Sequence, residues 1–278
     1  MDLEKLNIGV IILIFFIAFL LFKIFSFSFK LLETAYVIKF RKPFYNHLYL
    51  RLKRLKPEEK LILKNNFSFY KRLNKKEQRY FEHRLHKFLD EKDFVGRDDL
   101  IITTEMRVLI SATAVMLTFG FRDFYIDIIS RIVVYPKIFY STSNKTYNKG
   151  EFNPRLKSLV LSWEDFKKGY AVNNDNLNLG IHEFTHAIQI NSLKSRDVSS
   201  VIFTDSFSEL SKLLNTNQHL KNKLMASNYF RKYAFTNQFE FLAVAIETFI
   251  ETPGAFKSQF PEVYYKIKQM LNFNIAGY

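Results

Sequence analysis

The longest apolar run of the chain lies close to its N-terminus. Residues 8–22 contain no charged side chain, and after Lys23 the apolar pattern continues to Phe29. About 20 such residues are enough for a helix to cross the hydrocarbon core of a membrane, while the long Lys23 side chain extends to the interface. A cleaved signal peptide needs a small-x-small site after the run, and a soluble core helix needs a polar face, but neither is present. We therefore predict an N-terminal transmembrane anchor over residues 1–30.

The charges that flank this run predict its orientation. Lys5 is the only basic residue before it, beside the acids Asp2 and Glu4. After the run the basic residues are frequent: Lys23, Lys30, Lys39, Arg41 and Lys42. By the positive-inside rule, the chain beyond the anchor lies in the cytoplasm. We predict a single-pass membrane protein with a basic juxtamembrane linker over residues 31–55 and one folded domain over residues 56–278.

The pattern beyond residue 56 predicts a mostly helical α+β domain. Two β-type runs, Ile132–Pro136 and Leu159–Trp163, indicate a small sheet, and the polar stretch 141–155 between them indicates a loop. Apolar spacing, capping residues and helix breakers predict helices that begin at Pro57 and that cover residues 74–90, 104–120, 205–220, 236–250 and 261–271.

The helix predicted from Asn74 carries His83 and His86, three residues apart. These histidines stand among Glu82, Arg84 and Lys87. We interpret this charged sequence as a solvated basic face rather than as a pair of metal ligands.

The pattern H-E-x-x-H is the strongest chemical signal in the chain. It occupies residues 182–186 within a helix-compatible stretch. Because residues four apart share one face of a helix, His182 and His186 can bind one metal ion. Glu183 then lies where its carboxylate can act on a water molecule at that ion, as in zinc peptidases.

A catalytic zinc ion needs a third protein ligand, and several downstream acids are candidates. They are Asp205, Glu209, Glu240, Glu247 and Glu251. Glu240 lies in a strongly apolar helix, where a carboxylate is unfavourable unless it is paired or binds a metal. Glu247, seven residues later, lies on the same helix face and could orient a ligand. The pattern of residues alone does not choose among these acids.

The composition of the chain limits which residues can bind a metal ion and which macromolecules the chain is expected to contact. The chain has 278 residues, 48% of them hydrophobic, which is typical of a globular protein. It has no cysteine, so any metal site must use histidine and carboxylate ligands. The net charge of +14 suits an anionic membrane face, and nucleic-acid binding is disfavoured because no recognition module accompanies the charge.

Several separated blocks resemble one family of enzymes. The chain is similar to the Mlc titration factor A (MtfA) family of zinc-dependent peptidases over about residues 56–270, and more distantly to the catalytic domain of anthrax lethal factor. The blocks that carry this resemblance are Phe88-Leu89, Phe94-Val95-Gly96, Thr103 to Arg107, Leu117 to Gly120, Tyr135-Pro136, Val160 to Trp163, His182 to His186, and Tyr233 to Glu247.

The resemblance implies a gluzincin-like zincin fold with one catalytic Zn²⁺. His182 and His186 would be zinc ligands, Glu240 the third ligand and Glu183 the general base. The tyrosine of the toxin-like relatives that matches Tyr233 lies at the active site, where its hydroxyl could stabilise the oxyanion; the alternative for Tyr233 is a packing role. The resemblance favours an aminopeptidase, while the residues themselves leave open whether cleavage occurs at the amino end or inside a peptide.

This chain departs from the family pattern at two places. Relatives keep an aspartate where this chain has Gln189, and that acid is suited to orienting a metal ligand. Some relatives also carry a histidine in the loop before the Ser-Trp strand, and residues 141–155 contain none. We therefore expect the direct ligands to be kept and their supporting contacts to differ.

These observations predict a membrane-anchored zinc peptidase that acts on peptides or proteins. Leu159 to Trp163 would be either the edge strand that pairs with an extended substrate or an ordinary strand of the sheet interior. The alternative function is that of a zincin-fold interaction protein that sequesters a regulatory partner, such as a transcription regulator.

Overall fold

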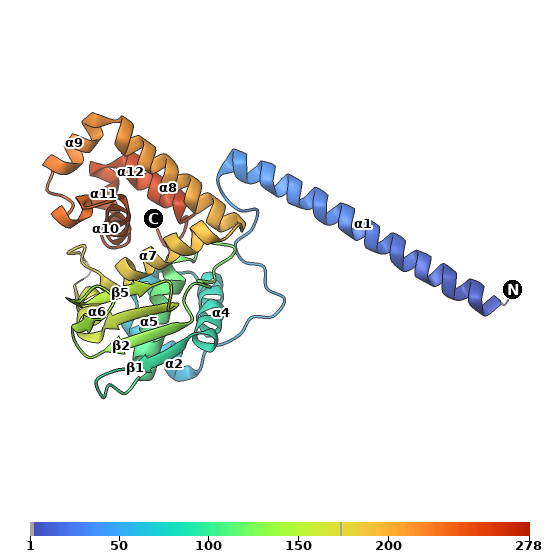
Figure 1. Ribbon diagram of the computed structural model, residues 1–278, viewed down its shortest axis with the longest axis horizontal. Helices are drawn as coiled ribbons and strands as arrows, with labels where there is room; N and C mark the ends of the chain where they lie inside the picture. The colour runs from blue at the N-terminus through green and yellow to red at the C-terminus, as the bar shows by residue number, and fades with distance from the viewer. Residues whose placement is uncertain (1–2, 173) are drawn as a thin grey trace. The chain divides into compact units, whose positions relative to one another are not determined.

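The computed structural model describes residues 3–172 and 174–278, so that Asp2 and Asn173 lie outside the described residues. The chain divides into two compact units, residues Met1–Phe44 and Tyr45–Tyr278. The first contains one long helix, and the second contains every strand and the remaining helices of the described chain (Figure 1).

The first unit is built on helix α1, Leu3–Phe40. Within its stretch Ile8–Phe40, an 18-residue window reaches a mean hydropathy of 3.0, and no residue of that window is buried. Within the described chain this is the helix that is long and apolar enough to cross a membrane. At 1.5 Å per residue, α1 is about 57 Å long. Residues 31–40, expected to belong to a linker, continue this helix.

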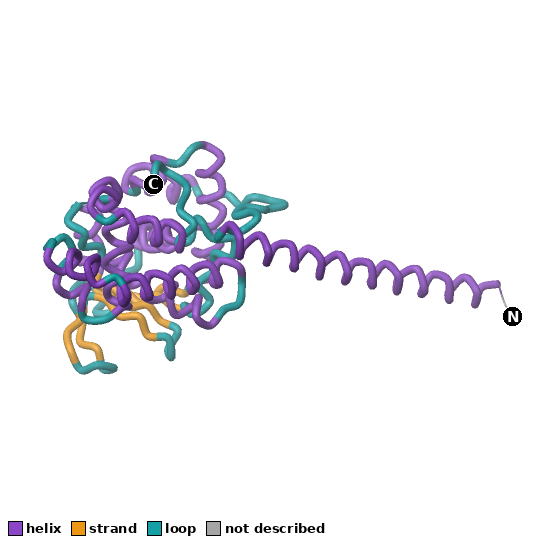
Figure 2. Tube along the Cα trace, turned by 90° about the horizontal axis from the view of Figure 1, so that it is seen from above, coloured by secondary structure: helices purple, strands orange, loops and turns teal. Residues whose placement is uncertain are grey.

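The second unit contains a four-stranded sheet in the order β1-β2-β6-β5. Strands β1 (Asp93–Gly96), β2 (Arg131–Tyr135) and β6 (Ser158–Ser162) run parallel, and β5 (Gly150–Asn153) pairs antiparallel with β6. Strands β3 (Phe139–Ser141) and β4 (Thr146–Asn148) form a separate antiparallel pair. Figure 2 shows these strands gathered at one side of the unit.

Strand β6 lies in the sheet interior, so of the two alternatives for residues 159–163 the structure shows the interior strand and not the edge strand. It pairs with β2 on one side and with β5 on the other, and Leu159 and Leu161 are fully buried. Such continuous burial is typical of a parallel strand that is covered on both faces. The edge strand next to β6 is β5, within residues 141–155, which were expected to form a loop, and β1 is the edge strand on the opposite side of the sheet. The polar sequence of β5 gives no apolar strand pattern, because a strand at the edge of a sheet tolerates polar side chains.

Helices form the rest of the second unit, and α7 (Leu179–Lys194) is the central one. It contacts α5, β5 and β6 in one part of the unit and α8 and α10 in another (Figure 1). The other helices are α2 (Pro57–Asn66), α3 (Ser68–Arg72), α4 (Lys75–Glu91), α5 (Thr104–Leu117), α6 (Trp163–Ala171), α8 (Val198–Thr216), α9 (Gln218–Ala226), the short 3₁₀ helix η1 (Lys232–Phe235), α10 (Gln238–Glu251), α11 (Pro253–Gln259) and α12 (Pro261–Met270).

Local capping chemistry determines where several of these helices begin. The Asn74 side chain accepts hydrogen bonds from the backbone of Lys76 and Glu77, and Glu77 accepts one from Asn74 in return, so the predicted capping box is present. Helix α5 begins at Thr104, and the side chain of Thr103 caps its N-terminus. The single helix predicted over residues 205–220 is instead two, α8 and α9. The mostly helical α+β prediction is confirmed.

The face of α4 that carries His83 is buried, which contradicts the prediction of a solvated basic face. His83 is 5% exposed, and its Nδ1 accepts a hydrogen bond from the backbone of Lys53. The chain before α2 covers this side of α4, a long-range contact that helical periodicity cannot reveal.

Arg84, which follows, is fully buried and joins three segments of the chain. Its guanidinium donates to the Tyr49 hydroxyl (2.7 Å), to the carbonyl of Asn46 (2.8 Å) and to those of Thr118 (2.8 Å) and Phe121 (2.7 Å). A buried charge is tolerated when its donors are satisfied in this way.

We expect Arg84→Met to lower the stability of the second unit by about 3 kcal/mol, because it leaves these buried acceptors without a donor. The melting temperature of the detergent-solubilised chain should fall by about 6–12 °C. Arg79→Met, at an exposed position of the same helix, is the matched control and should change it little. An equal change in both variants would contradict the structural role of Arg84.

Candidate metal centre

The N-terminus of α7 is fixed by Asn178. The Asn178 side chain accepts a hydrogen bond from the backbone of Ile181 (3.1 Å) and donates to the carbonyl of Gly169 (2.7 Å). Its backbone N–H donates to Glu247 of α10 (2.8 Å). The start of α7 is therefore held to α6 and to α10 before the first histidine is reached.

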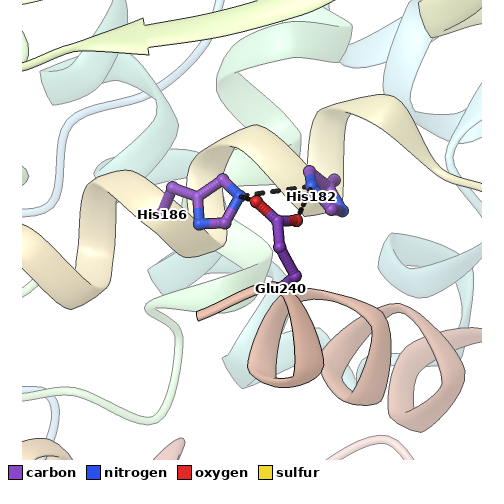
Figure 3. Close-up of side chains that lie close together, drawn as sticks. All are labelled: His182, His186 and Glu240. Carbon is purple, nitrogen blue, oxygen red and sulfur yellow. Dashed lines mark hydrogen bonds and ion pairs between the residues drawn. The ribbon is translucent and has the colours of Figure 1, made fainter. Parts of the chain in front are cut away.

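The structure brings His182, His186 and Glu240 together (Figure 3). The two histidine Nε2 atoms are 3.2 Å apart. Glu240 Oε2 lies 3.1 Å from Nε2 of His182, and Glu240 Oε1 lies 3.6 Å from Nε2 of His186. Helix α7 supplies both histidines on one face, as their spacing predicts, and the first turn of α10 supplies the carboxylate.

These distances fit a cation held by all three side chains. Ligands about 2.0–2.2 Å from a tetrahedral zinc ion stand roughly 3.3–3.6 Å from one another. Glu240 Oε2 is buried and accepts no well-aligned hydrogen bond from the described residues, although the His182 ring is close. Two imidazole nitrogens and one carboxylate are also the type of ligand set that catalytic zinc uses.

The charges of the three groups perturb one another. Burial opposes protonation of His182, but the adjacent carboxylates of Glu240 and Glu247 outweigh it and raise the pKa of His182 to about 9. Burial works against ionisation of Glu240 as well, yet the two histidines hold its pKa well below the usual range. The site thus favours a positive charge beside the Glu240 carboxylate, and a metal ion can supply it in place of the proton on His182.

A second set of contacts orients His182. Its Nδ1 lies 2.7 Å from Oε1 of Glu247, which directs Nε2 towards Glu240 and His186. Arg231 donates to both oxygens of Glu247, at 2.7 and 3.1 Å, and to the carbonyl of Asn176 at 2.7 Å. A carboxylate that holds the second nitrogen of a ligating histidine is the usual support for a zinc ligand.

Glu183 lies beside this cluster and is 7% exposed. Burial raises the pKa of Glu183, so this carboxyl group accepts a proton more readily than one in water. A Cβ atom added to Gly150 of β5 would lie 2.6 Å from the Glu183 side chain. The absence of a side chain at Gly150 therefore lets the edge strand pass directly over the Glu183 carboxyl group.

Tyr233 of η1 is half exposed, with its ring 6.1 Å from that of His182. Burial of the hydroxyl and the nearby Glu240 carboxylate raise the pKa of Tyr233 to about 12. Its hydroxyl is therefore protonated at neutral pH and available as a hydrogen-bond donor at the edge of the cluster.

Gln189 is 1% exposed, and neither its amide nitrogen nor its amide oxygen has a hydrogen-bond partner within the described chain. It therefore does not orient His182 or His186, the role suited to the acid of relatives. In this chain Glu247 contacts His182 instead.

Sequence reasoning identified His182, His186 and Glu240, which the structure brings together, but missed several side chains that position them. Arg231 and Asn178 were not identified, because isolated polar residues in loops give no periodic signal. Gly150 was hidden in a stretch expected to be a loop. The asparagine-rich stretch before α7 gave a hint, since Asn178 stands where an N-cap residue is expected.

The chain was compared with known proteins. Residues 44–272 match the family model described as glucose-regulated metallo-peptidase M90. A protein of Synechocystis sp., described only as uncharacterized, is 26% identical over 234 residues, which cover 77% of this chain and 83% of the relative.

We expect Glu247→Gln to weaken metal binding about 10- to 100-fold, because it removes the negative charge that supports His182. Competition against a chromophoric chelator measures this change in Kd. The matched control is Glu251→Gln on the same helix. Glu251 bonds to Asn176 and Asn178 but not to His182. Its substitution should change Kd less than about threefold, and an equal loss in both variants would contradict the specific role of Glu247.

Proposed function

Because the chain belongs to the M90 family of glucose-regulated metallopeptidases, we propose that it is a zinc-dependent peptidase whose ion is held by His182, His186 and Glu240. The observation that carries this proposal is the convergence of these three side chains at the spacing of tetrahedral zinc ligands. The more distant resemblance to anthrax lethal factor stays a prediction.

In this proposal Glu183 is the general base. When bound, Zn²⁺ supplies the positive charge that polarises a peptide carbonyl and makes a water molecule acidic near neutral pH. Glu183 accepts the proton of the attacking water and passes it to the leaving amine. Its burial suits this cycle, because a raised pKa makes the Glu183 carboxylate a better proton acceptor than one in water.

Tyr233 is the candidate donor to the oxyanion that develops on the peptide carbonyl. Its position beside His182 and Glu240 supports this role, as does its half-exposed side chain, which a bound substrate can reach.

We place the substrate along β5. The outer side of this strand pairs with no other strand of the described chain, and its first residue, Gly150, lies over Glu183. An extended peptide that adds to this edge by main-chain hydrogen bonds has its backbone next to the general base. Residues 159–163, the alternative considered from the sequence, are paired on both sides and leave no free edge for a peptide.

We further propose that α1 anchors the enzyme in a membrane and that the basic residues after the anchor keep the second unit in the cytoplasm. Aminopeptidase specificity and a regulatory protein partner stay predictions.

Hydrolysis of an unstructured peptide by the zinc-loaded full-length chain tests the proposed activity. We expect Glu183→Gln to lower kcat by a factor of about 10²–10⁴ while zinc remains bound, because the base is lost and the ligands are kept. His182→Ala should lose zinc, as metal analysis would show. If the zinc-loaded wild type cleaves no peptide in a diverse library, the peptidase assignment is wrong and the interaction-protein alternative gains support.

We expect Gly150→Ala to lower kcat about 100-fold, because the added methyl group displaces the Glu183 carboxyl group from its position. Zinc content should not change, since the substitution touches none of the three proposed ligands. Gly254→Ala is the matched control, because a Cβ atom there has no neighbour within 4 Å. Wild-type kinetics for Gly150→Ala would argue against the placement of β5 over the general base.

A further inference from the structure

One surface of the second unit carries more positive charge than the fold neutralises. Lys53, Arg54, Lys60 and Arg79, here called the basic surface, line a cavity of about 370 Å³ together with Leu52 and Glu82. The surface joins the segment before α2, α2 itself and α4.

Glu82, the single acidic residue of this cavity, already has an ion-pair partner and a hydrogen-bond donor. Glu82 Oε1 lies 2.7 Å from the Lys60 amine and accepts a hydrogen bond from the Tyr70 hydroxyl at 2.6 Å. Within residues 3–172 and 174–278, no ion pair joins Lys53, Arg54 or Arg79 to a carboxylate. Three positive charges around one cavity therefore lack a counter-charge from the protein, which suits an anionic partner.

The chain enters the second unit close to the end of its apolar run. Within the first unit, the Phe44 ring stacks on Tyr36 at a centroid distance of 4.3 Å and lies 6.1 Å from Phe29. Phe29 is the last residue of the run that is expected to cross the membrane. The chain therefore turns back along α1 before it leaves the first unit at Phe44.

Inside the second unit, this entry segment is bonded to α4 beside the basic surface. The His47 ring stacks on Tyr80 at 4.6 Å, and the Tyr49 hydroxyl accepts a hydrogen bond from Arg84. Tyr80 directly follows Arg79 of the basic surface. Lys53 of the basic surface follows the last residue of α1 by only 13 residues, so the covalent connection gives the basic surface a high effective concentration towards a membrane that α1 crosses.

We propose that the basic surface binds the phosphate groups of anionic lipids in the membrane that α1 crosses. This contact holds the catalytic unit against the bilayer rather than leaving it on a mobile tether. The proposal rests on the proposed membrane anchor but not on catalysis. Lipid phosphate is favoured over nucleic acid because the charge is concentrated where the chain leaves the membrane.

A fluorescent label on the full-length chain tests this contact. The chain has no cysteine, so Asn65→Cys places a single label on α2, about 8 Å along the helix from Lys60. Asn222→Cys places a control label on α9. Both proteins, carrying Glu183→Gln so that activity plays no part, are reconstituted into vesicles that contain a headgroup-linked quencher.

We expect the label on α2 to be strongly quenched in vesicles with 30% phosphatidylserine and weakly quenched in phosphatidylcholine vesicles. Raising the salt to 0.5 M should release it, because salt screens the contact. The triple variant Lys53→Gln/Arg54→Gln/Arg79→Gln should weaken docking about 100-fold, at roughly fivefold for each residue.

The control variant Lys212→Gln/Lys221→Gln/Lys257→Gln removes the same charge from exposed positions outside the basic surface and should leave quenching unchanged. Equal loss in both triple variants, or equal quenching in both kinds of vesicle, overturns the proposal. Displacement by inorganic phosphate at constant ionic strength, or tighter binding to single-stranded RNA than to the vesicles, also overturns it. Extraction of the chain by alkaline carbonate overturns the membrane anchor, whereas failure of peptide hydrolysis leaves this test unaffected.

Discussion

The pairing of Glu247 with Arg231 and His182 is the interaction on which the candidate site depends. One carboxylate accepts from a guanidinium and from the backbone of Asn178, and it contacts Nδ1 of His182. It therefore joins α10, the loop before η1 and the start of α7 at one buried point. Because Glu240 lies seven residues before Glu247 on α10, the same contact sets the position of the third candidate ligand relative to both histidines.

Because Glu247 is buried, its negative charge is stable only while Arg231 and Asn178 remain in contact with it. Glu247 is 1% exposed, and an ionised carboxylate in such surroundings is stable only with its charge paired and its oxygens hydrogen-bonded. Arg231 supplies the charge, while Asn178 supplies a further donor and also caps α7. The same residue, Asn178, thus fixes the start of α7 and supports the carboxylate that orients His182.

The sequence predicts the local features of this protein well and its long-range contacts poorly. The two histidines follow from helical spacing, the apolar α1 from hydropathy, and the start of α4 from its capping box. The burial of His83, by contrast, depends on a chain segment about 30 residues away. The inner position of β6 depends on a polar strand that looks like a loop, because strand order is decided by pairing partners and not by the strand itself. Arg231 acquires its role only when α10 folds back onto α7.

Gln189 has a consequence for the evolution of this chain. A buried amide without hydrogen-bond partners lowers the stability of a fold by about 1–3 kcal/mol relative to one that is satisfied. Natural proteins stay above a stability threshold without reaching an optimum. The fold can therefore be stabilised at Gln189 in the second half of α7, about one turn beyond the candidate ligand His186. A substitution at Gln189 that removes the unsatisfied amide would raise the stability of the fold, and this gain would offset destabilising substitutions closer to the substrate.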